Sequence, residues 1–272
     1  MPPSAETASR PRLTFFFPAY NEEENVERTV ELALAEIGPM VDDSIEVLVV
    51  DDGSSDRTPE LADAMAASDP RVRVHHQPNR GYGGALKAGF EHSRGELICF
   101  SDGDLQFDLK EMDRLLARLE EGTDGHAQRG AAGGAQVSAA RKAVDVVIGY
   151  RIRRRDPLHR IFIAKTYNAI VSVAFGLRVR DIDCAMKLFR REVFDGLRLD
   201  AEGPFLSAEL LIKLRARGAR IAQVGVNHYP RAAGMNTGAS FLKILRTFRD
   251  LARLRWALWT RREEVLGTSP GQ

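Results

Sequence analysis

A short apolar run followed by an acidic turn, Glu96-Leu97-Ile98-Cys99-Phe100-Ser101-Asp102-Gly103-Asp104-Leu105-Gln106-Phe107-Asp108, decides how the rest of this sequence is interpreted. The run is short enough for a β-strand, and alternate side chains of a near-extended segment point the same way. The sequence therefore predicts that Asp102, Asp104 and Gln106 present three oxygen ligands at one strand end. Ligands of this kind suit Mg²⁺ or Mn²⁺, which keep coordination positions for water and substrate phosphate. Gly103 between the two acids is expected to leave room for a ligand to approach the backbone.

Two other interpretations of the acidic turn are open. In the first, it is a solvated turn that binds no metal and that precedes a helix with Asp108 as its N-cap. In the second, it begins an EF-hand loop. That loop fits less well, because Phe107 and Asp113 stand where an EF-hand has glycine and glutamate. The choice depends on whether the rest of the chain builds a phosphate-ligand site around the turn.

The composition limits the class of protein. A chain of 272 residues with 44% hydrophobic residues fits one large globular domain with a real core. A net charge of +1 argues against nucleic-acid binding over a wide surface. Cys99 and Cys184 predict no disulfide framework, so a cytoplasmic protein is expected. Residues 1–12 predict a flexible tail without a signal peptide, and no apolar run is long enough to span a bilayer.

Strands and helices alternate through the first half of the chain. Apolar strands are predicted over 13–17, 45–50, 72–75 and 97–100, and helical periodicity follows them over 22–37, 58–67, 79–90 and 109–119. This alternation indicates an α/β fold with a mostly parallel sheet between helices. Further strands and helices are predicted over 144–151, 165–176, 205–217, 220–226 and 240–262, whereas residues 122–142 predict a flexible insertion.

Polar residues follow each of the first four predicted strands. They are Asn21 with Glu22, Asp51 with Asp52, the segment 79–84, and Asp102 to Gln106. Asn21 is also expected to cap the helix that follows the first strand. Ligands of parallel α/β sheets bind at the carboxyl ends of the strands. Clusters at four such ends therefore indicate the rim of one nucleotide pocket. The glycine run at 81–84 matches a dinucleotide loop poorly, because Leu86 stands where the last glycine is needed.

A basic run, comprising Arg151, Arg153, Arg154, Arg155 and Arg160, joins a predicted strand to an apolar helix beside this pocket. Charge runs of this kind usually form a solvated face. Here the position favours anion binding, because arginine binds phosphate oxygens through two parallel hydrogen bonds.

With these residues in place, the chain resembles glycosyltransferase family 2 enzymes of the GT-A fold, and within them the dolichol- or polyprenol-phosphate mannose synthase group. The resemblance covers residues 13–237 and rests on an ordered set of motifs. They are Pro18-Ala19-Tyr20-Asn21-Glu22, Asp51-Asp52-Gly53-Ser54-Ser55-Asp56, Asn79-Arg80-Gly81 with Gly83-Gly84-Ala85, Asp102-Gly103-Asp104-Leu105-Gln106, Gly149-Tyr150-Arg151, Pro157-Leu158-His159-Arg160 with Tyr167-Asn168, and Arg231 with Gly234.

The resemblance implies roles for particular residues. It implies metal binding by Asp102, Asp104 and Gln106, with Asp104 also counted as catalytic. It implies donor contacts from a second set of residues: Pro18, Tyr20, Glu22, Asp52, Gly81 and Asp102. It implies catalytic phosphate contacts from Arg151, Arg160 and Arg231. The chain departs from the group at 181–187, at Ala164 and at 223–225, which surround the acceptor side.

The implied reaction is an inverting transfer of a hexose from GDP-mannose or UDP-glucose to a polyprenyl phosphate, with Mg²⁺ or Mn²⁺ as cofactor. A lipid phosphate is already an anion and needs no strong base. A hydroxyl acceptor is the alternative, and it would need a base such as Asp181, Asp183 or Glu209. A dehydrogenase is disfavoured by the broken glycine motif, and a non-enzymatic membrane-peripheral binding protein would leave the four strand-end clusters unexplained.

The last predicted helix, within the C-terminal segment 238–272, carries apolar residues at helical spacing, many arginines, and Trp256 and Trp259 near its end. An ordinary amphipathic helix packed on the core is one interpretation. A helix that lies in the interface of an anionic membrane is the other, since arginine and tryptophan are typical of such helices. The second interpretation places the protein peripherally on the inner face of the membrane, where a polyprenyl phosphate head group is accessible.

Overall fold

The computed structural model describes residues 10–121, 143–152, 158–201, 203, 205–230 and 241–267, with the backbone alone described at 158–164, 241–246 and 248. Its strands form one seven-stranded sheet in the order β3-β2-β1-β4-β6-β5-β7. The strands span β1 Leu13–Ala19, β2 Ile45–Asp51, β3 Val72–His76, β4 Leu97–Phe100, β5 Val146–Arg151, β6 Lys187–Arg190 and β7 Ile221–Val226. The predicted α/β fold with a mostly parallel sheet is confirmed.

The central strand β1 pairs in parallel with both β2 and β4, so Leu13 lies opposite Ile45 on one side and Leu97 on the other. Only β6 among the described strands runs antiparallel to its neighbours, β4 and β5. The strand order reverses direction between β1 and β4. In open α/β sheets this reversal leaves a crevice at the carboxyl ends of the two strands, where ligands bind.

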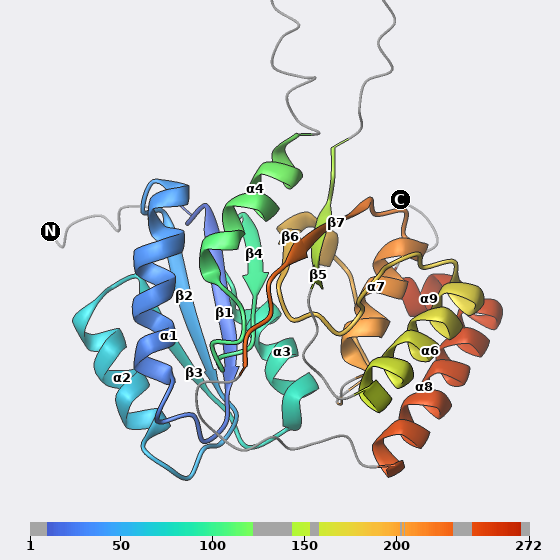
Figure 1. Ribbon diagram of the computed structural model, residues 1–272, viewed down its shortest axis with the longest axis horizontal. Helices are drawn as coiled ribbons and strands as arrows, with labels where there is room; N and C mark the ends of the chain where they lie inside the picture. Colours follow the sequence, from blue (N-terminus) through green and yellow to red (C-terminus); the bar gives the residue numbers. More distant parts are fainter. Residues whose placement is uncertain are drawn as a thin grey trace, which may run out of the picture.

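Helices flank the sheet (Figure 1). The helices of the first half are α1 Val26–Leu32, α2 Thr58–Ser68, α3 Gly81–His92 and α4 Met112–Glu120; those of the second half are α6 Leu158–Phe175, α7 Leu206–Ala216, α8 Phe241–Thr260 and α9 Arg262–Leu266. Helix α3 approaches the sheet closely at Gly89, where an added Cβ would lie 2.1 Å from the ring of Phe16. A larger residue there would push α3 away from β1.

The helices α6, α7, α8 and α9 gather at the end of the molecule opposite α1 and α2 (Figure 1). Helix α8 buries Leu251 and Leu254 against the core, and Leu258 packs there with a smaller buried fraction. None of the described helices combines the length and the apolar character that crossing a bilayer requires.

The first predicted helix differs most from the structure. Helix α1 begins only at Val26, and after Leu32 the chain continues as a π-helical turn at Ala33–Ile37 and a 3₁₀ turn at Gly38–Val41. The predicted tail, up to residue 9, and the predicted insertion 122–142 lie outside the described residues. The domain boundaries therefore stay predictions.

Candidate active site

The ends of β1, β2 and β4 are tied together, so the residues that follow them share one edge of the sheet. The backbone N–H of Asp52 donates to the carbonyl of Ala19 at 2.9 Å, and that of Ser101 donates to the carbonyl of Phe16 at 3.3 Å. Tyr20, Asp52 and Asp102 therefore follow adjacent strands at the reversal between β1 and β4. This is the place where the strand-end clusters were predicted to meet.

The loop after β1 is held to the loop after β2 by hydrogen bonds in both directions. The N–H of Asn21 donates to Oγ of Ser54 at 3.0 Å, and its Oδ1 accepts from the N–H of Ser55 at 2.8 Å. The N–H of Glu22 donates to Oγ1 of Thr58 at 2.8 Å. Asn21, which the sequence predicted to cap a helix, instead has a positive φ of 54° and links the two loops. The prediction of a cap was wrong, because Asn tolerates the left-handed conformation that this link needs.

The predicted donor contacts at β1 differ in exposure. Pro18 is half-buried opposite Val50, whereas the ring of Tyr20 is exposed just past the strand end. The carboxylate of Glu22 accepts from Nδ2 of Asn25 at 2.7 Å, which fixes it at the start of α1. An exposed aromatic ring beside a fixed carboxylate is a combination that can stack on a base and accept hydrogen bonds from it.

Asp52 is buried and connects β2 to the start of α3. Its Oδ1 accepts from Nε2 of Gln77 at 2.6 Å and from the N–H of Arg80 at 2.8 Å. The second contact holds the backbone next to Gly81, whose φ of 73° starts α3 in a conformation that favours glycine. Asp52 and Gly81, both predicted donor contacts, are thus parts of one connected loop structure.

Asp51 was placed in a predicted strand-end cluster without a contact of its own, and the structure gives it a supporting role. Its Oδ2 lies 2.9 Å from Nδ1 of His76, and Nε2 of His76 lies 3.1 Å from Oδ1 of Asp63. Partial burial lowers the pKa of His76, but the hydrogen bonds to the two carboxylates outweigh this effect and raise the pKa overall. The pair Asp51 and His76 therefore anchors the end of β2 from the side of β3.

The acidic turn after β4 is not extended. The chain turns at Gly103–Leu105, and Leu105 has a positive φ of 58°. The prediction that Asp102, Asp104 and Gln106 alternate on one extended face was therefore wrong in its geometry. Asp108 does cap the 3₁₀ turn Leu109–Glu111, as predicted, since its side chain accepts from the N–H of Lys110 at 3.1 Å.

Gly103 is required by packing. A Cβ added there would lie 2.8 Å from the ring of Phe17, and Oγ1 of Thr29 lies 3.1 Å from the carbonyl of Gly103. The turn is therefore clamped between β1 and α1, whereas the sequence suggested that the glycine leaves room for a ligand. This clamp fixes the backbone that carries Asp102 and Asp104.

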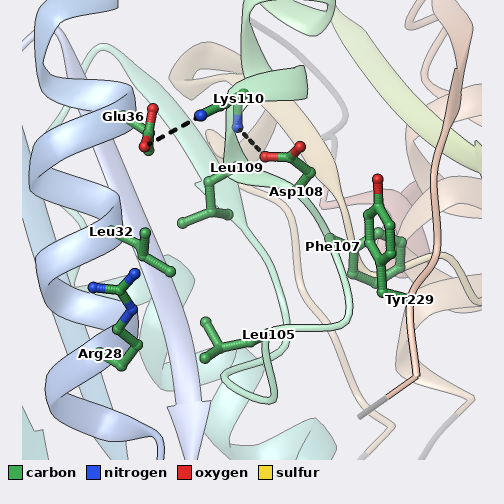
Figure 2. Close-up of a pocket in the computed structure, with 9 residues that line it drawn as sticks. All are labelled: Arg28, Leu32, Glu36, Leu105, Phe107, Asp108, Leu109, Lys110 and Tyr229. Atoms are coloured by element: carbon green, nitrogen blue, oxygen red, sulfur yellow. Dashed lines mark hydrogen bonds and ion pairs between the residues drawn. The ribbon is translucent and has the colours of Figure 1, made fainter. Parts of the chain in front are cut away.

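Gln106 is joined to the segment that follows β7. Its Nε2 donates to the carbonyl of Tyr229 at 3.1 Å, and the N–H of Tyr229 donates to the carbonyl of Gln106 at 2.8 Å. On the side of the turn that faces α1, the side chains of Leu105 and Leu109 line a pocket of about 330 Å³ with Leu32 (Figure 2). The amide nitrogen of Gln106 is therefore already used in a hydrogen bond that joins two segments of the fold. Metal binding by Gln106 stays a prediction.

The carboxylates at this turn suit a metal ion that a nucleotide diphosphate also coordinates. Asp102 and buried Asp104 flank Gly103, and within the described part of the chain no group of three or more His, Cys, Asp or Glu side chains could hold a metal alone. Mg²⁺ is commonly held by one or two carboxylates together with substrate phosphates and water. The arrangement therefore suits Mg²⁺ or Mn²⁺ in the presence of a nucleotide diphosphate, which stays a prediction.

Tyr82, at the start of α3, lies in the predicted segment 79–84 but was given no role of its own, and it reaches the acidic turn from the other side. Its hydroxyl donates to Oδ1 of Asp102 at 3.0 Å. The residue is 36% exposed, and the partial burial of its side chain together with the carboxylates Asp102, Asp183 and Asp104 raises the pKa of Tyr82 above its usual value. Tyr82 therefore stays protonated and remains a hydrogen-bond donor. The effect also places Asp183, from the segment before β6, near the same turn.

Arg151, predicted to bind phosphate, forms a two-point ion pair at the end of β5. Its Nε lies 2.6 Å from Oδ2 of Asp181, and its terminal nitrogen lies 2.8 Å from Oδ1. Both side chains are largely buried. The same pair engages Asp181, which was one of the candidate bases. A phosphate role for Arg151 stays a prediction and would add to this pair.

Glu209, another of the candidate bases, is held by structural contacts. Its carboxylate accepts from the N–H groups of Asp200 and Ala201 at 3.0 and 2.8 Å, and lies 2.7 Å from Nζ of Lys213. It holds the loop before α7, so the structure argues against a base at this position. For Arg160 only the backbone is described, in α6, and Arg231 lies outside the described residues. Their phosphate contacts stay predictions.

Lys187 is a buried cation that sequence reasoning did not select as a site residue. It begins β6 beside Phe100, and its Nζ donates to the carbonyl of Cys184 and lies 5.0 Å from the centre of the Phe100 ring. Burial lowers the pKa of Lys187, and the negative charges of Asp183, Asp181 and Asp102 oppose this effect. The available signal was a lysine at the start of a short strand whose next two residues, Leu188 and Phe189, are apolar.

With this geometry in view, comparison with known proteins assigns the family. The model of the family described as "Glycosyl transferase family 2" matches residues 14–198. The chain belongs to glycosyltransferase family 2. The family predicted from the motifs is confirmed by this match.

Relatives with curated names are 29–34% identical to this chain over the aligned residues. Glycosyltransferase AglD of Haloferax volcanii is 34% identical over 233 residues, covering 84% of this chain and 35% of that protein. Undecaprenyl-phosphate 4-deoxy-4-formamido-L-arabinose transferase of Pseudomonas aeruginosa is 30% identical, with 86% and 62% covered, and that of Proteus mirabilis is 29% identical, with 88% and 66% covered. The chain thus spans from about a third to two thirds of the lengths of these relatives.

Among solved structures, the family 2 domain is similar in fold to glucosyl-3-phosphoglycerate synthase from Mycobacterium tuberculosis. Its complex with UDP has a TM-score of 0.61 at 23% identity, covering 92% of this chain and 81% of that one. Its complex with Mn²⁺ and UDP-glucose has a TM-score of 0.57 at 20% identity, with 97% and 82% covered. These likenesses confirm the GT-A fold.

Proposed function

We propose that this chain transfers a hexose from a nucleotide diphosphate sugar, GDP-mannose or UDP-glucose, to a polyprenyl phosphate, with inversion at the anomeric carbon. The proposal is supported by relatives of up to 30% identity that are named as undecaprenyl-phosphate sugar transferases. It would make the chain similar in reaction to the mannose synthase group that its motifs resemble.

The donor would bind where β1 and β4 diverge. Tyr20 and Pro18 would meet the base, Glu22 and Asp52 would accept hydrogen bonds from base or ribose, and the start of α3 at Gly81 would lie beside the diphosphate. The loop-to-loop hydrogen bonds of Asn21 support this proposal, because they fix the rim before the donor arrives. A preformed site avoids the entropy cost of ordering loops on binding.

Asp102 and Asp104 would hold Mg²⁺ or Mn²⁺ together with the donor diphosphate. When bound, such an ion neutralises the negative charge that grows on the departing nucleotide diphosphate. Buried Asp104 is fixed by the turn, since its Oδ1 accepts from the N–H of Gln106 at 3.2 Å. Arg151, Arg160 and Arg231 would add cationic contacts to donor and acceptor phosphates.

The proposal of a phosphate acceptor in place of a hydroxyl acceptor rests on the contacts that two of the candidate bases already make. Asp181 is paired with Arg151, and Glu209 is bound to Lys213 and to two backbone N–H groups. A hydroxyl acceptor needs a base that can reach it, whereas a phosphate anion needs only cationic positioning. Asp183 is exposed near the acidic turn, and a hydroxyl acceptor with Asp183 as base is the second candidate function.

Helix α8 would bring the protein to the inner face of an anionic membrane. Its inner face packs on the core through Leu251 and Leu254, while Trp256 and Trp259 are 63% and 72% exposed. Their rings contact each other at 5.4 Å between centroids, and Arg249, Arg253, Arg255 and Arg261 are exposed around them. Exposed tryptophans among arginines are typical of helices that lie in a membrane interface.

An acceptor panel tests the function. Purified protein with Mn²⁺ is given labelled UDP-glucose or GDP-mannose, and either undecaprenyl phosphate, undecaprenol or a soluble sugar as acceptor. The proposal expects label in the lipid fraction only with undecaprenyl phosphate. Label on a hydroxyl acceptor alone would favour the second candidate, and Asp183→Asn should then abolish that transfer.

A further inference from the structure

A second, larger cleft of about 1430 Å³ opens between the start of α3, the loop before α7 and the helix α8. It is larger than ordinary small-molecule pockets, which enclose about 300–1,000 Å³. Of the residues assigned above to the donor, only Gly81 lines it. Its volume, and lining residues that extend along α8 from Thr247 to Ala257, suit a long ligand.

The inner end of the cleft touches the acidic turn. Tyr82 lines the cleft, and its hydroxyl donates to Asp102 at 3.0 Å. A ligand group that reaches Tyr82 therefore lies next to the carboxylate assigned to the metal and the donor diphosphate. The cleft and the proposed donor site are therefore continuous at the start of α3, through Gly81 and Tyr82.

The walls farther out are largely apolar, and each acid among them has a cationic partner. Phe205 and Leu254 are buried, and Ala257 and Trp256 continue the wall along α8. Lys213 is shared by Glu209 and Asp200, at 2.7 and 2.8 Å, and Arg249 lies 3.2 Å from Asp250. The apolar side chains between these ion pairs leave a wall for a hydrocarbon chain.

Cations mark the α8 side of the cleft. Exposed Arg249, Arg253 and Arg261 line it, and across the described residues no carboxylate lies within ion-pair distance of Arg253. An anion entering from a membrane surface would be attracted along this side. The cleft thus combines an apolar wall, an unpaired cation and an inner end at the acidic turn.

We propose that this cleft is the acceptor site: the isoprenoid chain lies along Phe205, Leu254 and Ala257, and the phosphate reaches Tyr82. This inference rests on the proposed function. Tyr82 is then a positioning residue, whose single hydroxyl proton turns from Asp102 to an acceptor phosphate oxygen when the acceptor binds. The exposed Trp256 lies where the chain leaves the cleft for the lipid phase.

Filling the wall tests the assignment. Ala257→Trp should raise the KM for undecaprenyl phosphate by about ten-fold or more. The added ring would occupy the space in which the isoprenoid chain makes its apolar contacts. The KM for a two-isoprene phosphate should rise less, and the KM for the donor should not change. Ala64→Trp, at an exposed position on α2, is the matched control and should leave all three constants unchanged. Equal long-chain KM values in Ala257→Trp and the parent would overturn the assignment.

Tyr82→Phe tests the inner end. Loss of a hydrogen bond to a charged group should raise the acceptor KM by about ten-fold or more, while the dissociation constant of UDP with Mn²⁺, measured by calorimetry, stays within two-fold. Equal loss of UDP binding would show that Tyr82 serves the donor side only and would overturn its acceptor role.

A labelling experiment on the unaltered protein does not depend on the folding of any variant. A polyprenyl phosphate with a benzophenone near its far end should label a peptide within residues 249–257, and excess undecaprenyl phosphate should compete. Label confined to other parts of the chain would overturn the cleft assignment. Absence of sugar transfer to any polyprenyl phosphate would instead contradict the proposed function itself.

Discussion

Arg151 at the end of β5 and Asp181 before β6 form a buried ion pair with two nitrogen–oxygen distances of 2.6 and 2.8 Å. The pair joins residues that are 30 positions apart and ties the segment before β6 to the candidate site. One partner, Arg151, is a predicted phosphate-binding residue, and the other, Asp181, is a candidate base. Because the pair is buried, we expect it to contribute to the stability of the fold.

Asp181→Asn should reduce the free energy of unfolding by about 3–5 kcal/mol, because it leaves the Arg151 guanidinium buried without its carboxylate. The two side chains are only 11% and 5% exposed. The surface pair Arg28 and Glu31, at 61% and 58% exposed, is the matched control. Glu31→Gln should change stability by less than about 1 kcal/mol. Urea unfolding measures both, and similar values for the two variants would contradict a buried pair.

Asp104→Asn should lower metal-dependent turnover by about 100-fold or more, which corresponds to roughly 2.7 kcal/mol of transition-state stabilisation. The charge of a buried ligand at the turn is lost while its size is kept. Asp108→Asn is the control four residues later, because Asn caps a helix as well as Asp does. Mn²⁺ binding in the presence of UDP, followed by electron paramagnetic resonance, should weaken only in Asp104→Asn. Full turnover in excess chelator would refute the metal assignment.

Gly103→Ala should destabilise the fold by about 1–3 kcal/mol through overpacking, since the new Cβ would lie 2.8 Å from the Phe17 ring. Gly203→Ala is the control, because an added Cβ there meets no atom within 4 Å. Thermal unfolding compares the two. Restored stability in Gly103→Ala combined with Phe17→Leu would identify the ring as the cause, whereas no loss in the single variant would refute the packing role.

The stability that His76 contributes should depend on pH. Because its pKa is raised in the folded state, this contribution is fully present below the unfolded pKa, near 6.5, and is lost as pH rises through the folded pKa. His76→Gln should therefore cost more stability at pH 5.5 than at pH 8.5. Unfolding in urea at the two pH values measures this difference.

His75 provides the control of opposite sign. Burial, followed by the charges of His92, His76 and Arg80, lowers the pKa of His75. The protonated form of His75 is therefore disfavoured in the folded state, so that His75→Gln should raise stability at low pH relative to the parent. A cost of His76→Gln that does not vary with pH would show that its two carboxylate contacts do not persist in solution.

Replacing Trp256 and Trp259 by alanine together should weaken binding to anionic liposomes, because both rings are exposed on α8. Binding by the parent should fall as salt rises, since each arginine near anionic lipid contributes about 1 kcal/mol. Tyr20→Ala removes an exposed aromatic ring elsewhere and is the control in the same sedimentation assay. Deleting α8 is a poorer test, because Leu251 and Leu254 are part of the core. A parent protein that ignores anionic liposomes would contradict the membrane role.

The sequence predicted the sheet and the convergence of its strand ends because both follow from local patterns. Apolar runs, turn residues and the rule for parallel sheets sufficed to bring Tyr20, Asp52 and Asp102 to one edge. The prediction for Asp108 as a cap succeeded for the same reason, since its partner is only two residues away.

The predictions that failed depend on contacts between distant segments. The positive φ of Leu105 and the packing of Gly103 on Phe17 are set by tertiary contacts, which spacing within the motif does not show. The partner of Arg151 is Asp181, from the segment before β6, so this ion pair could not be read from the charge run. Glu209 pairs with Lys213 four residues on in α7, a spacing that the sequence does show, but its contacts with the N–H groups of Asp200 and Ala201 come from the preceding loop. Buried Lys187 gave only a weak signal, because one lysine in a strand is usually exposed.

The central claim is sugar transfer to a lipid phosphate with inversion, and the structure of the product tests it most directly. The protein is incubated with Mn²⁺, undecaprenyl phosphate and the α-linked donor that gave transfer, and the lipid product is analysed by proton and phosphorus magnetic resonance. The account predicts a phosphodiester in which the anomeric carbon carries the phosphate in the β configuration. An α-linked product, or a sugar attached to a hydroxyl oxygen, would contradict it.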